Sequence, residues 1–337
     1  MLRTTIAKHP VVTAAFPTGS RRRAAVKRLW PAPPRRAAPL RTEEAKLRGV
    51  WAGYRQDMLE RYLVSGYQDP RINVPSILAR HTLVRAIFGS EFDPLMREEL
   101  AWAVELNEAI RVRAAELGVK IKPTLDPDHL ADVQRVSEVI ADRVPEFGGR
   151  WRDTLAGRQA APLSVLEYAC GSANDYSAFA DYGIARFLDY TGVDLNETNI
   201  ANARRKFPDV NFRLGSVLDL PEQDRSVDYV IGFDIMEHLS LPAMQHAMDA
   251  AVRICRRGLY FAFFRMDEVP GHVDNPRGDY HFNLLSAPLV RQDMAGRFGT
   301  AELIRIADLL KDEFGYEHSY NRKAYALITE NPAPASG

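Results

Sequence analysis

The sequence predicts an α/β fold in which a mostly parallel sheet follows an all-helical segment. Three observations lead to this fold class. Strands alternate with helices in five repeats after residue 160, these strands are near-continuous apolar runs, and apolar stripes at helical spacing occupy residues 42–150. Apolar strands that alternate with helices are typical of a parallel sheet covered on both faces. We expect seven strands, with an antiparallel edge formed by the last two.

The length and charge of the chain limit the classes of function. Its 337 residues suffice for an α/β domain with a sizeable extension. Residues 1–41 contain ten Lys and Arg and no acid, whereas residues 42–337 contain 34 basic against 44 acidic residues. Such a mildly acidic body argues against a nucleic-acid partner for the folded part. Because residues 1–41 are rich in Pro and Arg, we expect a disordered basic tail, with a targeting segment or an arm for acidic surfaces as the alternative.

The cysteine and hydropathy patterns favour a cytoplasmic protein. Cys170 and Cys255 are too few for a disulfide framework, and no CxxC pair is present for zinc. No apolar run approaches the length of a membrane span, and the N-terminus lacks the apolar core and cleavage site of a secretory signal. A homodimer is compatible with this composition.

Residues 42–150 are predicted to form a helical N-terminal domain or lid. Apolar stripes at spacings of three and four run through 51–63, 77–88 and 130–140, and Asp93-Pro94 and Asp126-Pro127 are typical helix starts. A further stripe consists of Ala103, Leu106, Ile110, Ala114 and Leu117. The aromatic and Arg side chains of this segment are expected to pack in a core, with a substrate lid as the alternative; they are Trp51, Tyr54, Arg55, Tyr62, Tyr67 and Arg71.

Residues 160–330 carry the predicted sheet, after a boundary at Gly148-Gly149, and residues 331–337 form a disordered tail. Strands are expected at 164–168, 190–193, 211–214, 227–233, 258–264, 302–306 and 324–329. Helices are expected at 175–182, 197–207, 242–255 and 284–298.

The stretch 165–179, VLEYACGSANDYSAF, is the predicted seat of the function. It consists of a buried strand, a turn of small residues and the first turn of a helix. A strand that runs into a glycine turn and a helix presents backbone N–H groups to a ligand at the carboxyl edge of the sheet. Gly171 and Ser172 leave room for that ligand to lie on the backbone.

Polar residues at the ends of the next three strands add to this site. Asp194 ends the second strand, where a carboxylate can accept both hydroxyls of a ribose. Ser216 and Val217 follow the third strand, and a hydroxyl with an apolar side chain suits an adenine. The run from Phe233 to Leu239, FDIMEHL, leaves the fourth strand.

In order and spacing, these motifs resemble the class I methyltransferases that use S-adenosylmethionine, over about residues 163–264. The resemblance implies a Rossmann-like methyltransferase sheet with S-adenosylmethionine as the cofactor. Two positions depart from the family pattern: Ala173 or Ser172 stands at its second glycine, and Ser216 stands where an adenine-binding acid is usual.

The resemblance also implies a role for each strand-end residue. Beside the methionine part of the cofactor it places Glu167, Ala169, Gly171, Ser172 and Asn174. On the ribose it places Asp194, and around the adenine it places Leu195, Ser216 and Val217. Beside the sulfonium it places Phe233 and Asp234, with His238 near the mouth of the site.

Two other functions are alternatives. A nicotinamide enzyme needs G-x-G-x-x-G so that a pyrophosphate can approach the helix N-terminus, and here Asp175 in that space would repel it. A methyltransferase-like scaffold or regulator without catalysis is the second alternative. The acid is tolerable, or useful, beside a sulfonium cation, and the sequence therefore favours methyl transfer.

The acceptor is expected to be a small polar molecule that is methylated on oxygen, or else on nitrogen. In order of preference, the expected acceptors are a glycan, a lipid-linked sugar and a secondary metabolite. This order rests on the long segment 265–283, which is polar and leaves the sheet beside the fourth strand. Candidate bases are His281, His238 and Asp234, and helix capping is the alternative role for the histidines. No metal is expected, although His272, Asp274 and His281 are the alternative ligand set. Cys170 is expected to pack behind the turn.

Overall fold

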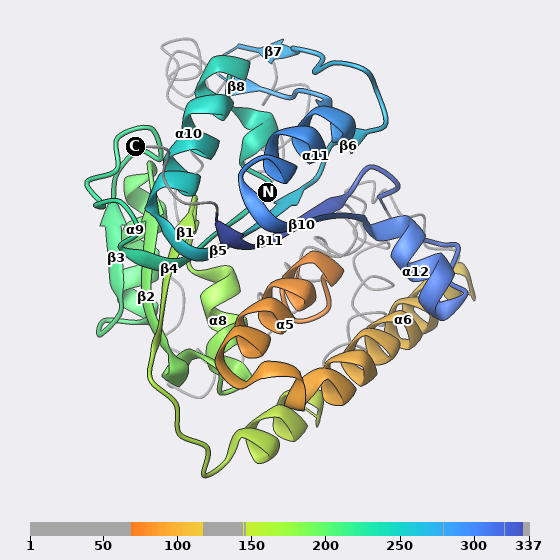
Figure 1. Ribbon diagram of the computed structural model, residues 1–337. Helices are drawn as coiled ribbons and strands as arrows, with labels where there is room; N and C mark the ends of the chain where they lie inside the picture. The colour runs from red at the N-terminus through yellow and green to blue at the C-terminus, as the bar shows by residue number, and fades with distance from the viewer. Residues whose placement is uncertain (1–68, 117–143, 145, 279, 320, 333–337) are drawn as a thin grey trace, which may run out of the picture.

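The computed structural model describes residues 69–116, 144, 146–278, 280–319 and 321–332 (Figure 1). The expected tail at 1–41, the helices expected at 51–63 and 130–140, and the C-terminal residues 333–337 lie outside the described residues. The predicted division into a helical domain at 42–150 and a sheet domain at 160–330 therefore stays a prediction.

The described part of the chain forms a seven-stranded sheet in the order β10-β11-β5-β4-β1-β2-β3. Its strands are β1 (Leu163–Tyr168), β2 (Leu188–Asp194), β3 (Asn211–Leu214), β4 (Val227–Phe233), β5 (Cys255–Phe263), β10 (Phe298–Arg305) and β11 (Tyr325–Pro332). Strands β1 to β5 pair in parallel, and β11 is antiparallel to both β5 and β10. The predicted fold class is confirmed, and β11 lies between β5 and the edge strand β10.

Helices cover both faces of this sheet, as Figure 1 shows. They are α5 (Val74–Phe88), α8 (Asn174–Asp181), α9 (Glu197–Lys206), α10 (Leu241–Ile254), α11 (Ala287–Ala295) and α12 (Ile306–Phe314). Consecutive residues of a strand point to opposite faces. Val165 accordingly belongs to the core shared with α5, α8, α9 and α12, and Leu166 to the core shared with α10 and α11.

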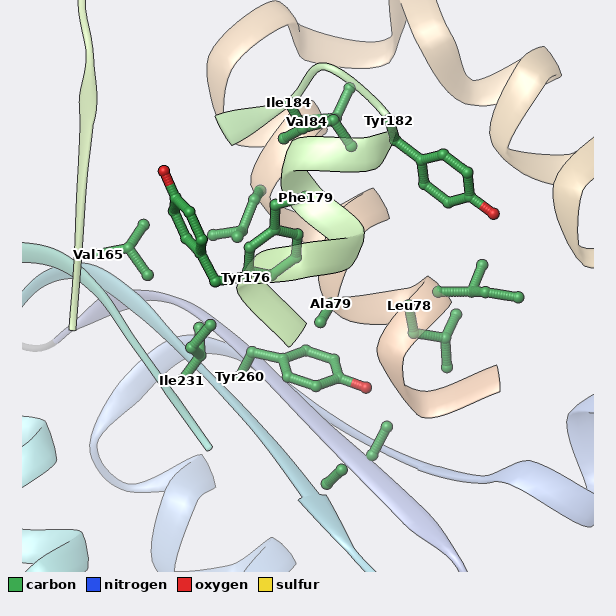
Figure 2. Close-up of a cluster of buried hydrophobic side chains, with 14 of the residues drawn as sticks. Leu78, Ala79, Val84, Val165, Tyr176, Phe179, Tyr182, Ile184, Ile231 and Tyr260 are labelled. Atoms are coloured by element: carbon green, nitrogen blue, oxygen red, sulfur yellow. The ribbon is translucent and has the colours of Figure 1, made fainter. Parts of the chain in front are cut away.

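Helix α5 is part of the core of the sheet (Figure 2). Ile77 and Leu83 of α5 are fully buried. The Ser76 hydroxyl donates to Asp175 Oδ1 of α8 at 2.8 Å, and the Tyr260 hydroxyl of β5 donates to the Pro75 carbonyl at 2.5 Å. These contacts join the predicted helical segment to the sheet and to the helix that follows β1.

A long helix, α6 (Asp93–Glu116), packs outside α5 after a short helix, η1 (Gly89–Phe92). The helix start predicted at Asp93-Pro94 is confirmed, and Ala103 and Leu106 of the predicted apolar stripe are buried. Arg80 of α5 and Glu99 of α6 form a fully buried ion pair at 2.5 Å, and the Trp151 indole donates to the same carboxylate at 3.1 Å.

The long polar segment 265–283 contains short strand pairs. Four two-residue strands occur in or beside it: β6 (Met266–Asp267), β7 (Pro276–Arg277), β8 (Tyr280–His281) and β9 (Leu285–Ser286). Strand β6 pairs in parallel with β9, and β7 pairs antiparallel with β8. Two further short helices are η2 (Ala185–Phe187) and η3 (Met236–His238).

Candidate active site

The candidate site lies where β1 and β4 end side by side. Strand β1 pairs in parallel with both β2 and β4. The chain leaves β1 for α8 on one face of the sheet and leaves β4 for α10 on the other face. The loops that follow two such strands diverge and leave a crevice at the carboxyl edge, which is where open α/β sheets bind ligands.

The turn after β1 has a strained backbone. Ala169, Gly171 and Ala173 have φ values of 52°, 55° and 62°, in the left-handed region that favours glycine. For an alanine this conformation costs about 1 kcal/mol. A Cβ added to Gly171 would meet no atom within 4 Å, so the backbone there faces open space. The strained conformation therefore belongs to a turn whose backbone is accessible to a ligand.

Asp194 fastens this turn to the end of β2. Its carboxylate accepts from the Gly171 N–H at 2.9 Å, from the Asn196 N–H at 2.7 Å and from the Asn199 amide at 3.3 Å. Asp194 is 8 % exposed. A carboxylate has about four acceptor positions, so these three bonds leave one for a ligand hydroxyl.

Residues near Asp194 complete this side of the crevice. The Ser172 hydroxyl donates to Asn199 Oδ1 at 3.3 Å, and Asn174 begins α8 with an exposed side chain. Leu195 is 76 % exposed, which gives an apolar ligand surface a partner beside Asp194. At the end of β3, Ser216 Oγ accepts from the Leu218 N–H at 3.1 Å, and Val217 is nearly buried.

Carboxyl groups that are buried or half-buried lie near the turn after β1. Burial raises the pKa of Glu167 well above its usual range, and repulsion from Asp175 and Asp194 adds to the shift, although the Tyr190 hydroxyl donates to Glu167 at 2.5 Å. Burial likewise raises the pKa of Asp175 to about 6. Each of these carboxyl groups gains its negative charge more readily when a cation lies nearby.

Asp234 is the carboxyl group at the end of β4. Its φ of 50° is again left-handed, and its N–H donates to the Ala262 carbonyl at 3.0 Å. Burial and repulsion from Glu237 and Asp175 raise the pKa of Asp234 well above its usual range. The Asp234 side chain lines a cavity at the carboxyl ends of β4 and β5, beside Phe233, whose ring centroid lies 5.7 Å from that of Tyr260.

The two predicted histidine bases lie together at the β7–β8 hairpin, because His281 belongs to β8 and His238 contacts it. His238 Nδ1 is 3.0 Å from the His281 carbonyl oxygen, and the His238 ring stacks on Phe282 with an angle of 13° between the rings. His281 Nδ1 is 2.8 Å from Asp274 Oδ1. Neither histidine is among the residues that line the cavity beside Asp234. Their catalytic role stays a prediction.

The alternative metal ligands do not gather. His272 Nδ1 accepts from the Ser286 N–H at 3.0 Å, whereas Asp274 contacts His281. Within the residues that the structure describes, no three His, Cys, Asp or Glu side chains are placed to hold one metal ion.

Three residues of the site were not predicted. Asn199 contacts both Asp194 and Ser172, and its position in the first turn of the helix after β2 was a usable signal. Tyr190 donates to Glu167 from the neighbouring strand, and their alignment follows only once β1 and β2 are paired. Asn73 lines the cavity beside Asp234, and no sequence pattern connects these two residues.

The fold and the site together define an α/β domain with a ligand crevice at the carboxyl edge of its sheet. Comparison with known proteins specifies the class: residues 165–258 match a family model described as "Methyltransferase domain". The match identifies a methyltransferase domain at residues 165–258 of this chain.

Curated relatives cover the same region. A Mycolicibacterium smegmatis protein named "Probable S-adenosylmethionine-dependent methyltransferase" is 32% identical over 132 residues, which are 38% of this chain and 49% of the relative. The phthiotriol/phenolphthiotriol dimycocerosates methyltransferase of Mycobacterium tuberculosis is 28% identical over 156 residues, which are 45% of this chain and 51% of the relative. The chain spans about half the length of the curated relatives it matches.

Solved structures with partial similarity include a Haloferax volcanii methyltransferase in complex with its Trm112 activator. Its TM-score is 0.39 at 18% identity, and the match covers 58% of this chain and 99% of that one. Another is the magnesium protoporphyrin IX methyltransferase of Synechocystis PCC 6803 with bound SAM, with a TM-score of 0.36 at 13% identity, covering 62% and 86% of the two chains.

None of the described helices combines the length and the apolar character that a membrane span requires.

Proposed function

We propose that this protein transfers the methyl group of S-adenosylmethionine to an oxygen of an acceptor molecule. The observation that carries the proposal is the open turn after β1 with acidic side chains around it. Asp175 stands in the first turn of α8, where a dinucleotide enzyme would seat a pyrophosphate, and its carboxyl group disfavours phosphate. A sulfonium and an ammonium group gain from the same charge.

The residues present fit this cofactor. The open backbone at Gly171 accommodates the methionine part, the remaining acceptor position of Asp194 suits the ribose, and the exposed Leu195 suits the adenine. Ser216 and Val217 complete the adenine side, and Glu167, Ala169, Ser172 and Asn174 flank the turn. When bound, the cofactor supplies a methyl group that is activated by the sulfonium charge.

In this reaction the protein orients the acceptor and takes its proton. Asp234 at the end of β4 has no hydrogen-bond partner for its side chain among the described contacts, and it faces a cavity. In its ionised form it can accept the hydroxyl proton as the oxygen attacks. Alignment of that oxygen in a water-poor site supplies much of the acceleration. His281 and His238 are the alternative bases.

The first experiment measures cofactor binding by calorimetry with S-adenosylhomocysteine. Asp194→Ala removes the hydrogen bonds to the turn and the acceptor for the ribose, so we expect affinity to fall at least about tenfold. The matched control is Asp189→Ala, which removes an exposed carboxylate from the same strand and should leave affinity unchanged. Absence of binding by the wild-type protein would refute the proposal.

A second experiment separates an enzyme from a cofactor-binding scaffold. Methyl transfer from labelled S-adenosylmethionine is measured with a panel of hydroxylated acceptors. Asp234→Asn keeps the shape of the side chain but removes its ability to take a proton, so turnover should fall by about a hundredfold. Cofactor binding should persist in this variant. If His281→Ala abolishes turnover and Asp234→Asn does not, the base is His281.

A further inference from the structure

The acceptor chemistry can be inferred from the cavity beside Asp234. The cavity opens at the carboxyl ends of β4 and β5, and its other walls come from the N-terminus of α5, from the first half of α12, and from Ser319, Asn321 and Ala324. It therefore adjoins the residue predicted to lie beside the sulfonium, on the side away from β2 and the ribose.

Most of the wall of this cavity is apolar. Its carbon-rich side chains include Val74, Pro75, Phe233, Phe264, Ile306 and Leu310. Among the described residues that line it there is no Lys or Arg, so a phosphate or carboxylate would enter without a counter-charge. A sugar would leave several hydroxyl groups unpaired against these carbons, at a cost for each group.

Within the part of the chain that the structure describes, two polar side chains that line the cavity, those of Asn73 and Asp234, have no hydrogen-bond partner. Asn73 is the N-cap residue of α5, yet its side chain makes no capping hydrogen bond. Asn at this position ordinarily accepts from the backbone of the first turn. The amide of Asn73 and the carboxyl of Asp234 line the same cavity, and they can donate to and accept from one hydroxyl group. By contrast, the Asn321 amide donates to the Phe264 carbonyl at 2.6 Å and is already used.

We infer that the acceptor is a neutral, largely apolar molecule with a single reacting hydroxyl group, oriented by Asn73 and deprotonated by Asp234. This inference rests on the proposed methyl transfer and narrows its acceptor class. We infer this apolar acceptor in place of the glycan expected from the sequence, because the polar segment 265–283 does not line this cavity. In the reaction, the hydroxyl oxygen forms the bond to the methyl carbon, the carbon–sulfur bond breaks, and the hydroxyl proton passes to the Asp234 carboxylate.

The test uses two homologous series, the 1-alkanols and the alkanoates, as binding probes in the presence of saturating S-adenosylhomocysteine. Alkanol affinity should rise about fourfold for each added methylene until the cavity is filled, as expected for transfer of CH₂ out of water. Alkanoates of equal length should bind at least tenfold more weakly. Equal affinity of the two series, or stronger binding of methyl glucoside than of hexanol, would overturn the inference.

Variants locate this binding in the cavity. Asn73→Ala should lower the affinity for every alkanol by about tenfold and leave the gain per methylene unchanged, because only the hydroxyl end is affected. Its melting temperature should change little, since Asn73 makes no capping bond. The control is Asn202→Ala on α9, away from the cavity. An equal loss in Asn202→Ala would contradict the assignment.

A second variant, Ala324→Leu, is designed to narrow the apolar end of the cavity. Ala324 lines the cavity and belongs to the same core as Ile306 and Leu310. Ala324→Leu should stop the gain in affinity at a shorter alkanol and should leave S-adenosylhomocysteine binding unchanged. An unaltered alkanol series in Ala324→Leu counts against the cavity. If the wild-type protein does not bind S-adenosylhomocysteine at all, the proposed function is refuted instead. Failure of the acceptor inference and failure of the proposed function can therefore be distinguished.

Discussion

The carboxyl groups around the crevice are unusual because burial opposes their ionisation. Burial is the largest cause of the raised pKa of Glu167, Asp175, Asp234 and Glu237. Repulsion among them adds to the effect for Glu167 and Asp234. The folded protein is less stable when these carboxyl groups are ionised and no ligand is bound. A bound cation offsets this loss of stability.

The first prediction concerns Asp175 and folding stability. Its folded pKa of about 6 exceeds its ordinary value of 3.8, so the folded state holds more protons than the unfolded state between these two values. Stability therefore falls as pH rises through this window. In Asp175→Asn this loss is absent, so between pH 4 and pH 7 the variant should gain about 2 kcal/mol of stability relative to wild type. Urea unfolding at four pH values measures this difference, and a constant difference would contradict it.

The second prediction compares the cationic cofactor with its neutral product. S-adenosylmethionine carries a sulfonium charge that S-adenosylhomocysteine lacks. As Asp175 ionises through its pKa of about 6, the affinity ratio of the two ligands should shift towards S-adenosylmethionine by about tenfold, as a nearby charge pair at moderate dielectric allows. Calorimetry between pH 5 and pH 8 gives the ratio. Asp175→Asn should flatten the dependence, and Asp189→Ala should not.

Residues at strand ends could be predicted from the sequence, and residues brought by packing could not. Asp194 and Asp234 each follow an apolar run, and the carboxyl ends of parallel strands meet at one edge. Asn73 has no such signal. It comes to Asp234 only because α5 packs across the sheet, over a separation in sequence that no local pattern spans.

At the scale of elements, α5 depends on a buried charge. Arg80 is fully buried, and burial disfavours its charge, but attraction to Glu99 outweighs this and holds the pKa of the guanidinium above its ordinary value. His81 and Trp151 contact the same carboxylate at 3.1 Å. This cluster joins α5, α6 and helical residues 146–155 beneath the sheet.

The third prediction removes one charge from this cluster. Glu99→Gln leaves Arg80 buried without its counter-charge and should destabilise the protein by about 3 kcal/mol. The neighbouring Glu98 pairs with Arg150 at the surface, where both side chains are about half exposed. Glu98→Gln should cost less than about 1 kcal/mol. Urea denaturation followed by circular dichroism compares the two, and equal effects would show that the buried pair is not needed.

Among the elements, long strands and helices were predictable and short ones were not. Helix α12 was missed because it continues directly from β10, and its N-cap residue, Arg305, makes no side-chain capping bond. Sequence signals for a helix start were therefore absent. Strands β6 to β9 have two residues each, too few to show a periodicity.

At the scale of the whole molecule, the sheet is extended by insertion of β11 beside β5. The register places Gly258 of β5 opposite Glu330 of β11 and next to Tyr229 of β4. A Cβ at Gly258 would lie 2.0 Å from the Thr329 carbonyl oxygen. This glycine therefore permits the close approach of the antiparallel strand to the parallel part of the sheet.

The fourth prediction tests this approach. Gly258→Ala should destabilise the protein by about 2 kcal/mol or more, because backbone atoms rather than a flexible side chain must move. Gly271→Ala is the matched control, since a Cβ there would meet nothing within 4 Å. Thermal unfolding of both variants gives the difference. Similar melting temperatures would mean that β11 can shift at little cost.

The N-terminus of α5 contacts residues of both proposed binding sites. Asn73, Val74 and Pro75 line the cavity beside Asp234, and the next residue, Ser76, holds Asp175 behind the turn after β1. A ligand that displaces one of these contacts alters the wall of the other site. Occupancy of either site should therefore change affinity at the other by one common factor, because such coupling is reciprocal. Calorimetric titration of each ligand with and without the other measures this factor twice, and the two values should agree.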